Sequence, residues 1–218
     1  NFTILTNSIF ATNGPGGTIT PSGTVWVNYG SSTNFALAPN ANYHVTNVVV
    51  DGTPMGPTNG WTFVSVTNGG HTITALFGID DYALTVTSPF GAPTPTGVTT
   101  NPWNTLINAN VPSPVPNGAS TQYVCTGWTG TGSTPLSGTS NSVSFNITNG
   151  SALAWNWKTQ FVLNVSAGAN GSVNGTNGWY DAAATPGTIT ATPSNGYHFV
   201  AWSGDTNGCV INGAEIQA

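Results

Sequence analysis

Apolar and polar residues alternate along most of this chain, as they do in strands that bury one face. Three stretches open with this alternation, at residues 2–4, 82–86 and 161–165, and their starts are almost evenly spaced. Residues 72–77 and 153–157 form two closing stretches of the same kind. No apolar period of 3.6 residues is sustained over three helical turns. The pattern therefore predicts an all-β chain with almost no helix.

A motif of Tyr, four residues and Trp, followed by Ser or Thr and Gly, recurs along the chain. Its copies run from Tyr123 to Trp128 and from Tyr197 to Trp202, and a looser copy from Tyr43 to Val48 has Val in place of Trp. The three Tyr positions are also close to evenly spaced. Self-similarity of this kind indicates repeated domains rather than one reactive site. We predict that each copy is a core strand of a small β-domain.

These spacings divide the chain into three small tandem antiparallel β-domains of β-grasp-like or sandwich type. The predicted domains are residues 1–79, 80–159 and 160–218. The second domain contains a proline-rich segment, residues 89–116. Repeated prolines remove backbone donors, so this segment is expected to be loop or edge strand.

The third predicted domain lacks its final strands. By the spacing of the first two, its closing strand would start near residue 232, whereas the sequence ends at Ala218. An open sheet edge invites a strand from a neighbour, and the natural donor is the N-terminal segment, residues 1–10, of another subunit. The alternative is a sequence that simply ends before these strands. Donation meets one objection, since the first domain needs the same segment for its own first strand.

Charge is nearly absent from the sequence. Charged residues make up 3% of the chain, with Lys158 as the one cation, no arginine, and a formal net charge of −5. A chain with so few cations cannot neutralise phosphates, which argues against nucleic acid or anionic membranes as partners. No apolar run approaches the roughly 20 residues of a membrane helix. Aromatic residues, at 11% of the chain, favour a folded chain over a disordered one.

Titratable side chains that could support catalysis are few. His44 and His198 both follow the Tyr of the repeated motif, so their place in the repeat explains them better than a reaction does. His71 has no carboxylate neighbour in the sequence, and a Ser, His and Asp triad could be assembled only by free choice among many serines. The sequence therefore predicts no enzyme activity and no catalytic residues.

Two sets of residues are candidates for tying adjacent domains together. Asp80 and Asp81 lie at the first domain junction, where calcium often stiffens tandem modules, and Asp51 is a third candidate ligand. The alternative is a solvated linker. Cys125 and Cys209 fall in different domains and match no metal motif. They are predicted either to form a disulfide or to be two small buried thiols.

Tryptophans outside the repeated motif are candidates for carbohydrate binding, because indole faces stack on sugar rings. These residues are Trp26, Trp61, Trp103 and Trp179. The competing interpretation is that thin domains need large side chains to fill their cores.

The third domain resembles a known family. Gly171–Val173, Ile189–Pro193, Gly196–Phe199 and Trp202–Asp205 are similar to the divergent internalin B-repeat domains, relatives of the Listeria–Bacteroides repeat. The first domain shows the same resemblance over residues 17–52, and the second shows it more weakly. The resemblance implies a β-grasp-like or sandwich fold, and tandem repeats that act as stalks, spacers or adhesive modules of bacterial surface and secreted proteins.

Sparse charge also offers little repulsion between copies. Together with the resemblance, it leads us to expect a non-enzymatic extracellular protein at the cell surface that is a stalk or a self-assembling filament or surface-layer subunit. The alternative function is a carbohydrate-binding or adhesin module with a polysaccharide partner. No cofactor is expected other than calcium.

Overall fold

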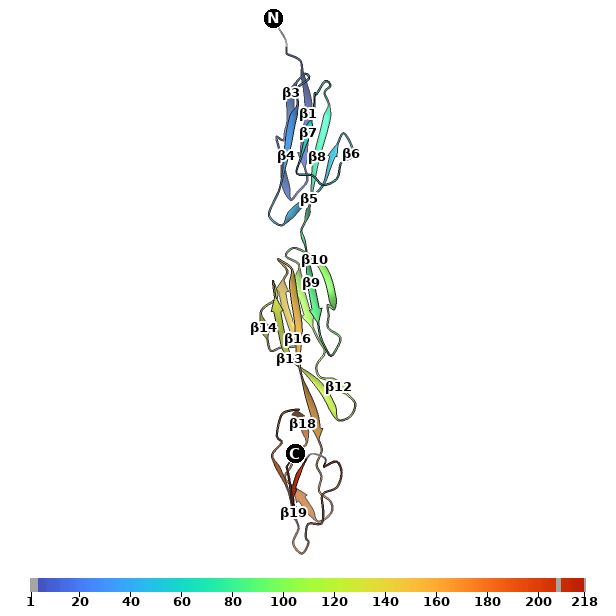
Figure 1. Ribbon diagram of the computed structural model, residues 1–218, viewed down its shortest axis with the longest axis vertical. Helices are drawn as coiled ribbons and strands as arrows, with labels where there is room; N and C mark the ends of the chain where they lie inside the picture. Colours follow the sequence, from blue (N-terminus) through green and yellow to red (C-terminus); the bar gives the residue numbers. More distant parts are fainter. Residues whose placement is uncertain (1–3, 207–208, 218) are drawn as a thin grey trace. The chain divides into compact units, whose positions relative to one another are not determined.

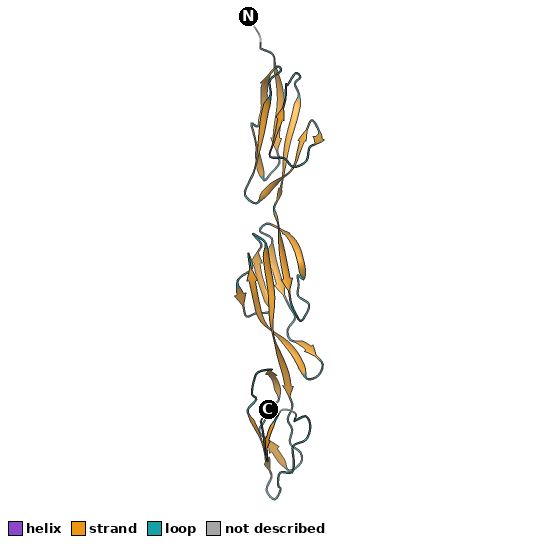
Figure 2. Ribbon diagram, viewed as in Figure 1, coloured by secondary structure: helices purple, strands orange, loops and turns teal. Residues whose placement is uncertain are grey.

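The computed structural model describes residues 4–206 and 209–217. Over these residues the chain forms strands, turns and loops but no helix (Figure 2), which confirms the all-β prediction. It divides into two compact units. The first is Asn1–Ala83 with Thr100–Thr105 and Asn146–Asn149, and the second is Leu84–Thr99, Leu106–Phe145 and Gly150–Ala218. The three predicted domains stay a prediction, and we use their ranges, 1–79, 80–159 and 160–218, as names for the first, second and third segments.

The described residues of the first segment form strands β1 to β8, most of which are labelled in Figure 1. They are β1 (Thr6–Asn13), β2 (Gly17–Thr20), β3 (Gly23–Asn28), β4 (Thr33–Pro39), β5 (Tyr43–Val50), β6 (Thr53–Pro54), β7 (Gly60–Phe63) and β8 (His71–Ile79). One sheet has the order β3-β1-β8-β5-β6, and a smaller one has the order β2-β4-β7. Apolar residues from both sheets join in one core, so the segment is a small β-sandwich.

The core of this sandwich is made of aliphatic and aromatic side chains. Ile9 and Ile73 come from the larger sheet and Phe35 from the smaller one, and all three are fully buried. Phe35 meets Phe63 edge to face, with ring centroids 5.9 Å apart. Complete burial of such side chains contributes about 1.5–3 kcal/mol each. Packing between the sheets is therefore a main source of the segment's stability.

Some strands of the larger sheet are parallel, so the prediction of antiparallel domains is wrong on this point. β1 runs parallel to β8, with Ile9 opposite His71 and Asn13 opposite Ala75. The chain enters the sheet along β1 and leaves it along β8 at the opposite end, which makes the two strands point the same way. Side chains alternate with a period of two in both kinds of ladder, so the alternation carried no information on strand direction.

The second segment repeats this arrangement. Its strands are β9 (Asp81–Thr87), β10 (Gly97–Pro102), β11 (Leu106–Asn110), β12 (Val115–Asn117), β13 (Thr121–Thr131), β14 (Ser137–Gly138), β15 (Ser142–Asn146) and β16 (Ser151–Leu163). The larger sheet has the order β10-β9-β16-β13-β12, and β11 pairs with β15 in a second sheet. β9 is parallel to β16, as β1 is to β8. The proline-rich residues 89–116, predicted as loop or edge strand, hold the edge strand β10 and also β11.

A closing strand lies at the centre of each larger sheet. In the first segment β8 closes the ladder with β5, where Tyr43 lies opposite Ile79 and Val48 opposite Ala75. The register shifts by one residue after Val45, as it does at a β-bulge. The Tyr-to-Val stretch is therefore a strand of the core sheet, as predicted.

The second segment has the same ladder between β13 and β16. Tyr123 lies opposite Thr159, the register shifts after Cys125, and Trp128 lies opposite Trp155. Partners, register and bulge all correspond to those of the first segment. Val48 and Trp128 therefore occupy the same structural position, as the sequence comparison predicted.

In its described residues the third segment contains counterparts of the smaller sheet and of one antiparallel pair of the larger sheet. Its strands are β17 (Gly171–Val173), β18 (Gly178–Asp181), β19 (Thr188–Pro193), β20 (Val210–Asn212) and β21 (Glu215–Gln217). β17, β19, β21 and β20 form one sheet in that order, and β18 pairs with the end of β16. Gly171 lies opposite Pro193 as Gly17 lies opposite Pro39. β17 and β19 thus correspond to β2 and β4.

Residues 197–203 form no strand, so the predicted core strand is absent from the third segment. Tyr197 is 58% exposed and Val200 is 83% exposed. In the other segments this stretch is a strand because β8 or β16 pairs with it. No strand of the part of the chain that the structure describes pairs with residues 197–203, which gives them no ladder to join.

The opening strand of the first segment lies further along the chain than predicted. Residues 2–4 were expected to form it, but residues 1–3 fall outside the described part, and Ile4 precedes β1 and is 70% exposed. Ile9 lies opposite the first residue of β8, as Leu84 lies opposite the first residue of β16. Ile9, rather than Ile4, is thus the counterpart of Leu84.

Candidate functional sites

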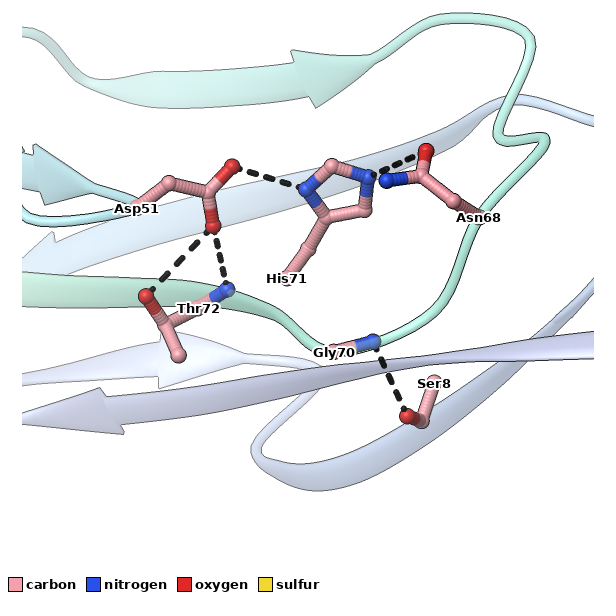
Figure 3. A network of polar contacts seen from close by, with 6 residues as sticks. All are labelled: Ser8, Asp51, Asn68, Gly70, His71 and Thr72. Carbon is pink, nitrogen blue, oxygen red and sulfur yellow. Dashed lines mark hydrogen bonds and ion pairs between the residues drawn. The ribbon is translucent and has the colours of Figure 1, made fainter.

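One network of polar side chains lies where β5 turns toward β6 and β8 begins (Figure 3). Asp51 and Gly52 form the turn with positive φ angles of 48° and 78°, as the Asp-Gly sequence predicts. Asp51 Oδ1 accepts the Thr72 N–H at 2.7 Å, and Asp51 Oδ2 lies 2.7 Å from His71 Nδ1. The other ring nitrogen, Nε2, lies 3.2 Å from Asn68 Oδ1.

This network positions a turn by holding the Asp51 carboxylate against the start of β8. Partial burial raises the pKa of Asp51, but the Thr72 N–H and the His71 ring outweigh it and leave that pKa below its ordinary value. Ser8 accepts the Gly70 N–H at 3.4 Å, and Asn68 occupies the ring nitrogen that would serve a nucleophile as base. The sequence did not predict the Asp51–His71 pair, because the two residues are adjacent only after β5 and β8 pair.

The first junction brings a histidine to one of its two aspartates. His44 Nδ1 lies 2.9 Å from Asp80 Oδ1, while Asp81 is exposed at the start of β9. Among residues 4–206 and 209–217 no three His, Cys, Asp or Glu side chains gather closely enough to hold a metal ion. Asp51, the third candidate ligand, is engaged by His71 instead. Calcium binding at Asp80 and Asp81 stays a prediction to which the structure adds no ligand.

The two cysteines are free thiols in the structure, and the disulfide between them stays a prediction. Cys125 lies in β13, where its sulfur accepts the Gly127 N–H at 3.4 Å. Cys209 precedes β20 in the third segment, and both residues are half-buried. The thiol of Cys125 thus fits the bulge of the β13–β16 ladder.

An aromatic face lies on the solvent side of the larger sheet in the first segment, and we define it by Phe10 and Trp26. Trp26 is 66% exposed and Phe10 is 52% exposed. Trp26 lies opposite Ser8 and Phe10 opposite Thr24, so the two rings are diagonal neighbours on one face. Thr72, beside Phe10 on the other side, adds a hydroxyl. Aromatic rings among hydroxyl groups suit the apolar faces and hydroxyls of a sugar.

The other three tryptophans proposed for glycan binding differ in exposure. Trp61 is half-buried and packs against the core of the first segment. Trp103 is also half-buried, and its backbone N–H donates to Asp80 O. Trp179 is 40% exposed on β18. Phe10 was not predicted as a binding residue from the sequence. Its exposure was indicated by an aromatic residue at a position where the alternation places a polar one.

The tryptophans of the repeated motif have different partners in the second and third segments. Trp128 is buried and meets Trp155 of the closing strand edge to face, with ring centroids 6.0 Å apart. Trp202 is half-buried, and its ring contacts Phe199 at a centroid distance of 5.7 Å. Beside Trp202 lies an open groove of about 300 Å³, lined by residues 166–173, 191–193 and 198–203.

Comparison with known families finds one match. Residues 161–217 match the model of the divergent InlB B-repeat domain, a repeat typical of bacterial surface proteins. The match covers the third segment, and the resemblance of the other two segments rests on their own residues. No curated protein and no solved structure matches the chain. No helix able to span a membrane was found in the described ranges.

Proposed function

We propose that the chain is a non-enzymatic, extracellular structural module of a bacterial surface protein, built of repeated β-domains whose copies associate with one another. The observation that carries this proposal is the repetition of one ladder, with its register, bulge and closing strand, in the first and second segments. Repetition of a whole folding unit is typical of stalks and filaments. The B-repeat match at residues 161–217 supports the same class of protein.

Strand continuity between segments supports a structural role. β16 closes the ladder with β13 and then pairs with β18 without a break, so one strand of 13 residues belongs to both the second and the third segment. A continuous strand is stiffer than a linker rich in Gly and Ser. Such a junction suits a module that carries load along its chain.

Electron microscopy and sedimentation of the purified chain test this proposal. We expect species larger than the monomer that grow with protein concentration, because sparse charge opposes contact only weakly. A test variant replaces the exposed apolar residues Val64 and Leu136 with acidic residues. This change should weaken lateral contacts between copies. Monomers at every concentration would remove the association from the proposal.

Glycan binding at the aromatic face is a second candidate function, favoured by the exposure of Trp26 and Phe10 on one sheet face. A flat face with two aromatic rings suits a polysaccharide chain rather than a small molecule. Retention on insoluble polysaccharides tests it, and loss of either ring should reduce retention about fivefold, since each stacking contact is worth on the order of 1 kcal/mol.

The variants for that test are Trp26→Ala and Phe10→Ala, with Val98→Ala as the control for an exposed apolar side chain elsewhere. Retention by wild type and Val98→Ala alone supports the candidate. If no polysaccharide retains the wild-type chain, or if all four proteins are retained equally, the aromatic face is not a glycan site.

A further inference from the structure

Trp179 and Trp26 occupy equivalent positions in the third and first segments. Trp179 lies opposite Val162 and is 40% exposed, and Trp26 lies opposite Ser8 and is 66% exposed. Val162 and Ser8 each directly precede the residue that corresponds to Leu84 of the second segment. An exposed indole thus recurs at one place on the sheet. Because core packing does not use an exposed ring, this recurrence points to a contact at the surface.

A row of three polar side chains lies beside Trp179. Gln122 of β13 lies opposite Gln160 of β16, and Gln160 lies opposite Asp181 of β18. Gln122 Nε2 donates to Gln160 Oε1 at 2.8 Å, and Gln160 Nε2 donates to Asp181 Oδ1 at 2.8 Å. Asp181 and Trp179 are two residues apart on β18, so their side chains share one face of the sheet. The row crosses three strands and therefore spans roughly 10 Å.

Lys158, the one cation of the chain, holds this row in place. Its Nζ lies 2.8 Å from Asp181 Oδ1 and 2.9 Å from Asp181 Oδ2. Hydrogen bonds from Lys158 and Gln160 lower the pKa of Asp181, so its carboxylate is ionised at neutral pH and only accepts hydrogen bonds. Side chains fixed in this way lose little freedom when a ligand binds. The row is therefore preorganised for a polar ligand.

The network keeps hydrogen-bonding capacity for a ligand. A glutamine amide has two N–H hydrogens and two lone pairs on its oxygen, and Gln122 and Gln160 each donate one hydrogen within the row. The side chains of Lys158 and Asp181 are 40% and 46% exposed, so a ligand can reach the ion pair. The charges of this pair cancel, which favours a neutral ligand over an anion or a cation.

We propose that this face binds a neutral polysaccharide, with Trp179 stacked on a sugar ring and with Gln122, Gln160 and Asp181 hydrogen-bonded to sugar hydroxyls. We call these four residues the polar–aromatic face. An indole ring beside fixed amide and carboxylate groups suits the apolar faces and hydroxyls of sugars. A sheet face that is about 10 Å wide suits an extended chain rather than a small molecule.

This inference extends the glycan candidate of the first segment to a second set of residues, and it does not depend on the association of copies. The test therefore uses a chain that already carries Phe10→Ala and Trp26→Ala, in which the aromatic face cannot contribute. Retention is measured on cellulose, chitin and granular starch as neutral polymers and on phosphocellulose as an anionic one. We expect this background chain to be retained by at least one neutral polymer.

Two outcomes of that measurement overturn the inference. If no neutral polymer retains the background chain, the polar–aromatic face is not a glycan site, whatever the wild-type chain does. Retention by phosphocellulose alone contradicts a neutral ligand. Sedimentation of the same proteins follows the association of copies separately, so the failure of one proposal can be told from the failure of the other.

Single substitutions in the background chain locate the site. Trp179→Ala removes the stacking ring and should reduce retention about fivefold. The matched control is Phe161→Ala, because Phe161 is also an exposed aromatic residue, at 50%, but follows Gln160 directly on β16 and so points to the other face of the sheet. Phe161→Ala should leave retention unchanged. An equal loss in both variants contradicts the assignment of the face.

Gln122→Ala separates binding from a purely structural role of the row. Gln122 is the end of the row, so its loss leaves the bonds of Gln160 and Lys158 to Asp181 in place. We expect retention to fall a few-fold, since one hydrogen bond is lost, while amide hydrogen exchange of residues 178–181 stays that of the background chain. Unchanged retention in Gln122→Ala, or faster exchange at β18 that accounts for its loss, contradicts a direct contact with the ligand.

Discussion

Trp128 and Trp202 hold the same place in the repeated motif, yet their surroundings differ. Trp128 lies in a long strand and packs on Trp155 of the closing strand, whereas Trp202 lies beside an open groove with Phe199 as its ring contact. The local sequences are alike, so the difference lies in the partner. The motif forms a core strand where a closing strand pairs with it and remains extended loop where none does.

The largest effect is expected from removing the partner ring in the second segment. Trp155 is buried at 2% exposure, and Trp155→Ala should cost about 3–5 kcal/mol of unfolding free energy, since it leaves a cavity beside Trp128. Urea unfolding followed by circular dichroism measures it. The matched change Trp202→Ala should cost much less, because that ring is only half-buried. Equal costs for Trp155→Ala and Trp202→Ala would contradict this difference in burial.

A smaller effect is expected from the glycines that face the closing strand. Gly17→Ala places a methyl group against the Phe77 ring, where a Cβ would lie at 2.5 Å, and should destabilise the first segment by about 1–3 kcal/mol. In the counterpart Gly171→Ala the nearest atom to the new Cβ is Thr192 O at 3.2 Å, so this change should cost less. Thermal melts of both variants check the difference. A larger loss for Gly171→Ala would contradict the difference in contacts at the two glycines.

The smallest effect concerns pH. The Thr72 N–H and His71 hold the pKa of Asp51 below its ordinary value despite partial burial. The contribution of Asp51 to the free energy of unfolding is therefore complete above its unfolded-state pKa, and it is lost as pH falls through its folded-state pKa. Because Asp51 is 45% exposed, the contribution should stay below about 1 kcal/mol. Asp51→Asn should flatten the acid side of the stability curve. An unchanged acid limb would mean that this pair does not stabilise the fold.

Much of the fold could be predicted from the sequence, because the repeat indicates both which residues form strands and which positions correspond between the ladders. The substitution of Val48 for Trp128 was predicted from spacing alone, and the ladders place the two residues identically. Strand direction could not be predicted, because alternation is the same in parallel and antiparallel ladders. The opening strand was misplaced because Phe2 and Ile4 have the alternation of a strand, although β1 begins at Thr6.

The candidate sites were less predictable, because they depend on pairings between distant strands. Phe10 and Trp26 share a face only through the β1–β3 register, and Asp51 reaches His71 only through the pairing of β5 with β8. The groove is lined by residues 166–173, 191–193 and 198–203, which are distant in the sequence.

Hydrogen exchange of backbone amides tests most directly whether the closing strand decides the state of the motif. In dilute protein, amides of residues 123–129 should exchange slowly and those of residues 197–203 quickly, because only the former belong to a ladder. Equal protection of the two stretches would contradict the account.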